Sequence, residues 1–193
     1  MENNANSVSP AERYFSGLVK FGISEESVSL LREKFGHKIE KASIGTKKDS
    51  GCAYEGSLLD VVFKAATNAR NINNFLSPSV KVDVKSLFKV CFLAMIGIAE
   101  RTIPQIDMWR QDHLGEMFVY KEGNVAIPNT WHSISMCSEC GISFSPEEIE
   151  AMTIIDRSDD DKQSRYYSSL LSTIVKSAFE ITFAEFKALE KKK

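Results

Sequence analysis

Histidine and cysteine, the side chains that most often bind transition metals, are few in this chain and widely separated. The three histidines are His37, His113 and His132, and none lies three or four residues from another, as two zinc ligands on one helix face would. We therefore expect each histidine to be a surface or packing residue.

A single CxxC motif is formed by Cys137 and Cys140, with His132 five residues upstream of Cys137. These residues could supply half of a zinc site, but no second CxxC and no HxxxH is present to complete it. The alternative is that they are reduced thiols packed within helices, which fits four cysteines in 193 residues. We favour the packing interpretation and predict no metal or other cofactor.

An acidic run between Asp156 and Lys162 is the only other group of candidate metal ligands. Carboxylate oxygens suit a hard cation, but the run lacks the glycine and the terminal glutamate of a calcium loop. We interpret it as a solvated loop before the next helix. The sequence also lacks a glycine-rich phosphate loop, a nucleophile elbow and a Ser-His-Asp order.

Apolar residues recur at helical spacing along most of the chain, so we expect helices to position the histidines, cysteines and acidic residues described above. The spacing predicts two helices within residues 11–40 and further helices over 57–75, 84–98, 131–140, from 145 onward and over 167–189. One segment differs, since residues 117–127 resemble two short strands around a Gly123-Asn124 turn. The predicted fold class is all-α, with a β-hairpin insertion among the helices.

Composition predicts one compact domain over residues 11–193, preceded by a flexible leader over residues 1–10. The net charge of −2 gives no chain-wide attraction to nucleic acid, so we expect no nucleic-acid partner. No apolar run approaches the roughly 20 residues that span a bilayer, and the polar N-terminus does not resemble a signal peptide. We expect a cytoplasmic protein with no membrane partner.

Three segments in this order resemble the HD-domain family of metal-dependent phosphohydrolases. They are GSLLD at 56–60, FLAMIGIAE at 92–100 and SSLLSTIVKSAFEIT at 168–182. The resemblance spans roughly residues 54–183 and is greatest to small phage and prophage members, which carry a hairpin insertion before a helix like FSPEEIEAM at 144–152. It implies an HD-domain-like helical bundle.

The metal-binding positions of that family are apolar in this chain. The family carries histidines and aspartates that hold a divalent ion, which activates a bound water. The matching positions here are Val61, Ala94, Met95, Ile98 and Phe179. None of these side chains binds a metal, so the resemblance implies a catalytically inactive domain whose former site packs into the core.

Around the lost metal site, the resemblance places a set of cationic and aromatic residues. Arginine and lysine bind phosphates, and aromatic rings stack on nucleobases. The resulting expectation is a ligand-binding site between the hairpin and the loop before the last helix. Its expected members are Arg101, Trp109, Arg110, His113, Lys121, Trp131, His132, Arg157, Lys162, Arg165 and Tyr166.

Three functions remain open at this level. The first is an inactive HD-like domain that binds or sequesters a phosphorylated small molecule, such as a cyclic nucleotide, as a phage counter-defence protein would. The second is a structural or protein-interaction scaffold, acting as an inhibitor or a homo-oligomer. The third is an enzyme with a relocated site that uses His113, His132 or the acidic run. The sequence favours the first two.

Overall fold

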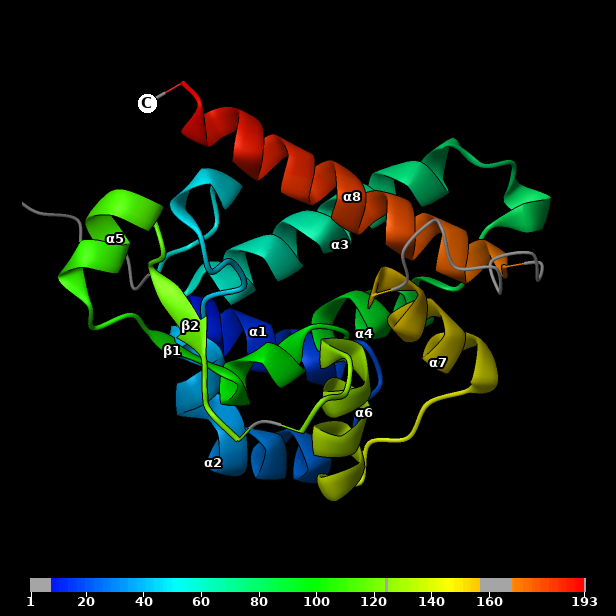
Figure 1. The fold of residues 1–193 in the computed structure, drawn as a ribbon. Coiled ribbons are helices and arrows are strands. Elements are labelled where there is room, and N and C mark those ends of the chain that lie inside the picture. The colour runs from blue at the N-terminus through cyan, green and yellow to red at the C-terminus, as the bar shows by residue number, and fades with distance from the viewer. Residues whose placement is uncertain (1–7, 124, 157–167, 193) are drawn as a thin grey trace, which may run out of the picture.

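The computed structural model describes residues 8–123, 125–156 and 168–192 (Figure 1). Eight α-helices account for most of this part of the chain, together with two short strands, so the predicted all-α class is confirmed. The helices are α1 Pro10–Lys20, α2 Glu25–Lys41, α3 Ser57–Phe75, α4 Val84–Leu93, α5 Met108–Leu114, α6 Asn129–Glu139, α7 Pro146–Thr153 and α8 Leu170–Glu190; the strands are β1 Thr102–Pro104 and β2 Phe118–Tyr120.

Local capping explains where several helices begin. Ser9 and Ser145 each accept a hydrogen bond from the backbone of a glutamate three residues later, and that glutamate bonds back to the serine N–H. Both helices also have proline in the first turn, where its missing N–H costs nothing. Asp83 is the N-cap of α4, and its carboxylate accepts from the N–H of Ser86.

The core lies where α3 packs along α8, with α1 and α4 on the inner side of this pair (Figure 1). Leu58, Val62 and Phe179 are buried there, as is Tyr14, whose hydroxyl donates to the carbonyl oxygen of Phe92 at 3.0 Å. A tyrosine hydroxyl buried without a partner would cost free energy, and this bond satisfies it. Among the described residues, no helix is both long enough and apolar enough to cross a membrane.

The positions matching the metal ligands of the HD family all lie in this core. Val61, Ala94, Ile98 and Phe179 are almost completely buried, and Met95 is 6% exposed. These side chains pack against other apolar groups, which is the burial that the sequence predicts for them.

The predicted helix over residues 84–98 is shorter than expected. The α-helix ends at Leu93, a turn follows at Ala94 and Met95, and residues Ile96–Glu100 form a 3₁₀-helix. The hydroxyl of Ser133 on α6 accepts from the N–H of Gly97 at 2.7 Å and donates to the carbonyl of Ala94 at 2.8 Å. Because a side chain of another helix satisfies these backbone groups, the α-helical pattern need not continue.

The small sheet also differs from the predicted hairpin. β2 lies within the first expected strand, but its antiparallel partner is β1, with Ile103 opposite Val119. Residues 125–127 form no strand, and Asn124 of the expected turn lies outside the described residues. Instead, α5 connects the two strands and projects from the body beside them (Figure 1). Asp107, which caps α5, and Gly115, which ends it, were the signals that could have revealed this helix.

Candidate functional site

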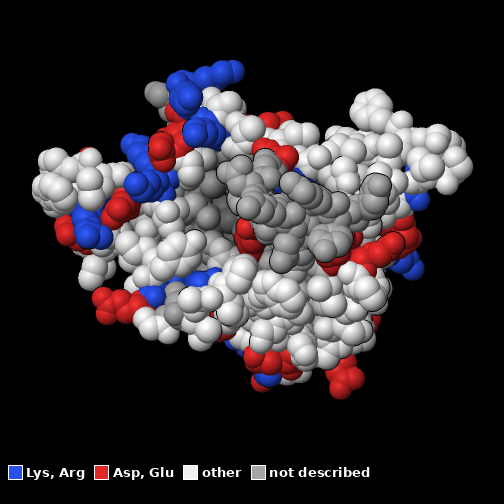
Figure 2. Space-filling view, turned by 45° about the vertical axis from the view of Figure 1, so that its right-hand side comes forward, with Lys and Arg blue, Asp and Glu red and all other residues white. Residues whose placement is uncertain are grey.

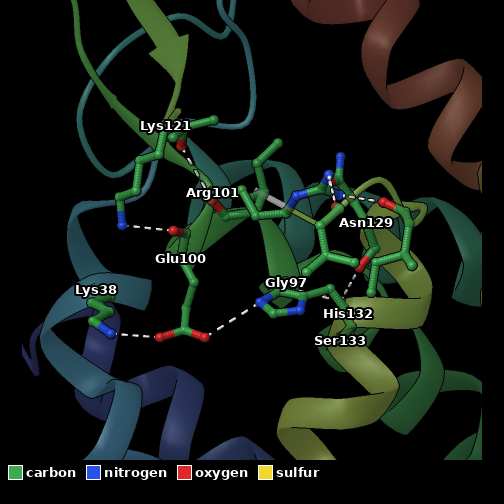
Figure 3. A network of polar contacts seen from close by, with 12 residues as sticks. Lys38, Gly97, Glu100, Arg101, Lys121, Asn129, His132 and Ser133 are labelled. Carbon is green, nitrogen blue, oxygen red and sulfur yellow. Dashed lines mark hydrogen bonds and ion pairs between the residues drawn. The ribbon is translucent and has the colours of Figure 1, made fainter. Parts of the chain in front are cut away.

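Three of the expected ligand residues gather around Glu100, at the end of the 3₁₀-helix (Figure 3). Its carboxylate accepts from the ammonium of Lys38 at 2.5 Å and lies 3.3 Å from Nε2 of His132. The ammonium of Lys121 donates to the carbonyl oxygen of Glu100 at 2.6 Å. Burial alone would raise the pKa of Glu100, but Lys38 and His132 outweigh it and lower this pKa.

The side chain of Arg101 forms hydrogen bonds with the segment that leads into α6. One guanidinium nitrogen donates to the carbonyl of Ile127 at 2.6 Å and to the side chain of Asn129 at 2.8 Å, and the other to the carbonyl of Val125 at 3.2 Å (Figure 3). These bonds fasten the segment before α6 to the end of the 3₁₀-helix. The contacts of Lys38, Lys121 and His132 with Glu100 thus couple α2, the residue that follows β2, and α6. Of these residues, only Lys121 also lines one of the clefts described below.

A second group of expected ligand residues lies on α5. The ring of Trp109 stacks on that of His113, with 5.0 Å between centroids, and Arg110 pairs with Glu116 at 3.3 Å. Trp131 lies apart from them on α6 and is half exposed.

The structure therefore places the described members of the expected site in separate groups. Arg101, Lys121 and His132 meet around Glu100, whereas the α5 residues and Trp131 lie elsewhere. The remaining members are outside the described residues: Arg157, Lys162, Arg165 and Tyr166. The predicted convergence on one ligand thus stays a prediction.

Cys137 and Cys140 are buried free thiols at the end of α6. Burial raises the pKa of both, so each favours its neutral form rather than the thiolate that binds zinc. Within residues 8–123, 125–156 and 168–192, no three histidine, cysteine or acidic side chains come together as a metal site.

A surface that the sequence analysis missed lies on the insertion between the 3₁₀-helix and α6. No residue of α5 is buried against the part of the chain that the structure describes. Large apolar side chains nevertheless occur along α5 and its flanking strands, and we call them the insertion surface: Ile103, Ile106, Met108, Trp109, Leu114 and Tyr120. Ile106 is 92% exposed and Met108 64%.

A groove of about 670 Å³ runs through the same insertion, between the strands and the start of α5. Ile103, Ile106 and Tyr120 line it, together with charged residues of both signs, among them Arg110 and Glu122. The insertion thus carries both projecting apolar side chains and an apolar-lined hollow.

A second feature missed by the sequence analysis is a lysine-lined cleft of about 680 Å³ at the C-terminal end of α8. Lys187 and Lys191 come from α8 and the residue that follows it, and Lys47 and Lys48 come from the loop before α3. Figure 2 shows Lys and Arg atoms gathering at the upper left, over this end of the molecule. The two lysine pairs are about 140 residues apart, so no local pattern could have joined them.

Comparison with protein-family models, curated proteins and solved structures found no match for the chain. The resemblance to the HD-domain family therefore rests on the sequence motifs alone.

Proposed function

We propose that the protein is an interaction scaffold that self-associates through its insertion surface. One observation carries the proposal: α5 and its flanking strands expose the apolar side chains of the insertion surface while α5 buries none of its own residues. Leaving such side chains in water costs free energy that burial against a partner recovers, at about 25 cal/mol per Å² of apolar surface.

The chemistry of the insertion favours a second copy of the chain as the partner. In a two-fold symmetric interface the same patch faces itself, so it must offer both a projection and a hollow. Met108 and Trp109 project from α5, and the groove lined by Ile103 and Ile106 lies beside them. Tryptophan is enriched among the residues that carry most binding energy.

The charges on the insertion also favour a second copy of the chain as the partner. A patch of one sign would repel its symmetric copy, whereas Asp107, Arg110, Lys121 and Glu122 place both signs around the groove. The groove therefore carries no excess charge of one sign that would repel a second copy.

The scaffold proposal includes the inactive HD-like domain expected from the sequence. Its support is that Val61, Ala94, Met95 and Phe179 are buried apolar side chains, which hold no metal and only contribute to the core. In this proposal the helical core serves to hold α5 in place.

The chain offers a matched test, because its two tryptophans are similarly exposed on different elements. Trp109 is 58% exposed on α5 and Trp131 is 50% exposed on α6. Sedimentation velocity over a concentration series should show a dimer whose dissociation constant rises about 30-fold in Trp109→Ala, since a central aromatic contributes about 2 kcal/mol. Trp131→Ala should leave the constant unchanged.

A second matched pair uses two side chains that are both 92% exposed, Ile106 in the insertion and Phe75 at the end of α3. Ile106→Ser should weaken the dimer, whereas Phe75→Ser should not. A monomer at all concentrations, or equal weakening by the insertion and control variants, would refute self-association through this surface.

A further inference from the structure

We infer that the lysine-lined cleft binds a small molecule carrying two or more phosphate groups. The cleft shares Leu114 with the insertion surface, but the inference does not depend on a dimer. It begins with the charges: Lys47, Lys48, Lys187 and Lys191 line one cleft, against two acidic residues, Asp49 and Glu190. The cleft therefore has an excess of positive charge, in a protein whose net charge is −2.

The four ammonium groups are available to a ligand. All four lysines are exposed, and none of their side chains forms a hydrogen bond or ion pair with a described residue. Lys38, Lys64 and Lys89, by contrast, each pair with a glutamate. Like charges held close together repel each other, and a phosphorylated ligand would relieve that repulsion.

Helix stabilisation explains only one of the two lysine pairs. Lys187 lies in the last turn of α8 and Lys191 directly after the helix, where cations interact favourably with the C-terminal carbonyl groups. Lys47 and Lys48 belong to a separate loop and do not serve that purpose. Their position opposite the end of α8 is what makes the cleft cationic on two walls.

The walls are fixed relative to one another. A Cβ on Gly51 would lie 2.1 Å from the carbonyl oxygen of Phe186, so only glycine lets the loop approach α8 this closely. The N–H of Lys48 donates to the carbonyl of Gly115 at 2.8 Å, which ties the same loop to the end of α5. Because the backbone of both walls is already in place, a ligand would not have to order the loop, and only the lysine side chains would lose freedom on binding.

The size and borders of the cleft favour a small ligand over a nucleic-acid strand. Its volume of about 680 Å³ lies within the range of small-molecule sites, roughly 300 to 1,000 Å³. An adjoining cleft of about 430 Å³ shares Lys48 but is lined by Asp112 and Glu190. These carboxylates would repel a long polyanion that continued beyond the lysines.

The experiment measures binding of tripolyphosphate and ATP to the full chain by isothermal titration calorimetry at low salt. The double variant Lys48→Gln with Lys187→Gln should weaken binding of both probes at least tenfold, because it removes one cation from each wall. The matched control, Lys81→Gln with Lys85→Gln, removes the same charge from exposed lysines outside the cleft and should change the affinity less than twofold. Circular dichroism spectra establish that both variants remain folded.

Three results would overturn the inference. The first is no heat of binding for either probe at millimolar concentration. The second is equal weakening by the cleft and control variants, which would show nonspecific attraction to surface charge. The third is tighter binding of a single-stranded oligonucleotide than of tripolyphosphate, lost in the cleft variant, which would assign the lysines to nucleic acid. Neither probe requires the dimer, so the Trp109→Ala protein should bind both with unchanged affinity.

Discussion

Replacing Gly97 with alanine should destabilise the protein strongly, because α6 lies directly against this residue. A Cβ at position 97 would be 2.4 Å from the carbonyl oxygen of Asn129, 2.7 Å from the backbone nitrogen of Ser133 and 2.9 Å from Cβ of His132. Two of these atoms belong to the backbone of α6 and cannot rotate away. The backbone of Gly97 does not have a positive φ, so the substitution isolates the steric effect.

The cost follows from these contacts. Overpacking a tight interface costs about 1 to 3 kcal/mol. Any shift of α6 that relieves it also lengthens the 2.7 Å hydrogen bond from the N–H of Gly97 to the hydroxyl of Ser133, a loss of about 1 kcal/mol. We therefore expect Gly97→Ala to lower the free energy of unfolding by about 2 to 4 kcal/mol.

Urea denaturation followed by circular dichroism measures this loss. The matched control is Gly36→Ala in α2, where the nearest atom to the new Cβ is the flexible Cγ of Arg32, at 3.3 Å. That variant should be neutral or more stable by up to about 1 kcal/mol, since alanine favours helix. Ser133→Ala, which removes the hydroxyl without overpacking, should cost about 2 kcal/mol. If the free energy of unfolding of Gly97→Ala lies within about 0.5 kcal/mol of the wild-type value, the proposed overpacking against α6 is wrong.

Two further predictions concern titratable groups, and a third concerns metal-dependent hydrolysis. Because the pKa of Glu100 is lowered in the folded protein, its ion pair stabilises above the pKa of an unfolded glutamate, about 4.3, and that stability is lost as the pH falls through the lower folded pKa. Denaturation from pH 7 to pH 3 should thus show Glu100→Gln less stable at pH 7, with the difference shrinking below about pH 4; a constant difference would contradict this. Burial raises the pKa of Cys91 to about 12 and also raises that of Cys137, so the thiols of the folded protein should react with Ellman's reagent only slowly at pH 8, whereas urea should expose all four. Phosphoester hydrolysis assayed with manganese, magnesium, nickel or iron should stay at background, since the buried side chains of Val61, Ala94, Met95 and Phe179 provide no imidazole or carboxylate at the positions that resemble the HD-family site, and turnover that increases with added metal would point to a relocated active site.

Local signals in the sequence determined most of the helices. The apolar spacing over residues 57–75 predicts α3 with the bounds that the structure shows, and Ser145 followed by Pro146 predicts the start of α7. Burial of Val61 and Phe179 also follows from sequence, because these apolar side chains lie on the faces of their helices that the apolar spacing assigns to the core. These inferences succeed because each depends on residues within one or two turns of one another.

Tertiary contacts decided what local signals could not. Ser133 ends α4 at Leu93 from a helix 40 residues away, and β2 pairs with Thr102–Pro104 rather than with the residues that follow it. The lysine-lined cleft forms because Gly51 lets the loop that carries Lys48 approach Phe186 on α8. Side chains far apart in the sequence come into contact only when the core packs. The free energy that stabilises these contacts comes from burial over the whole domain, so no local pattern predicts them.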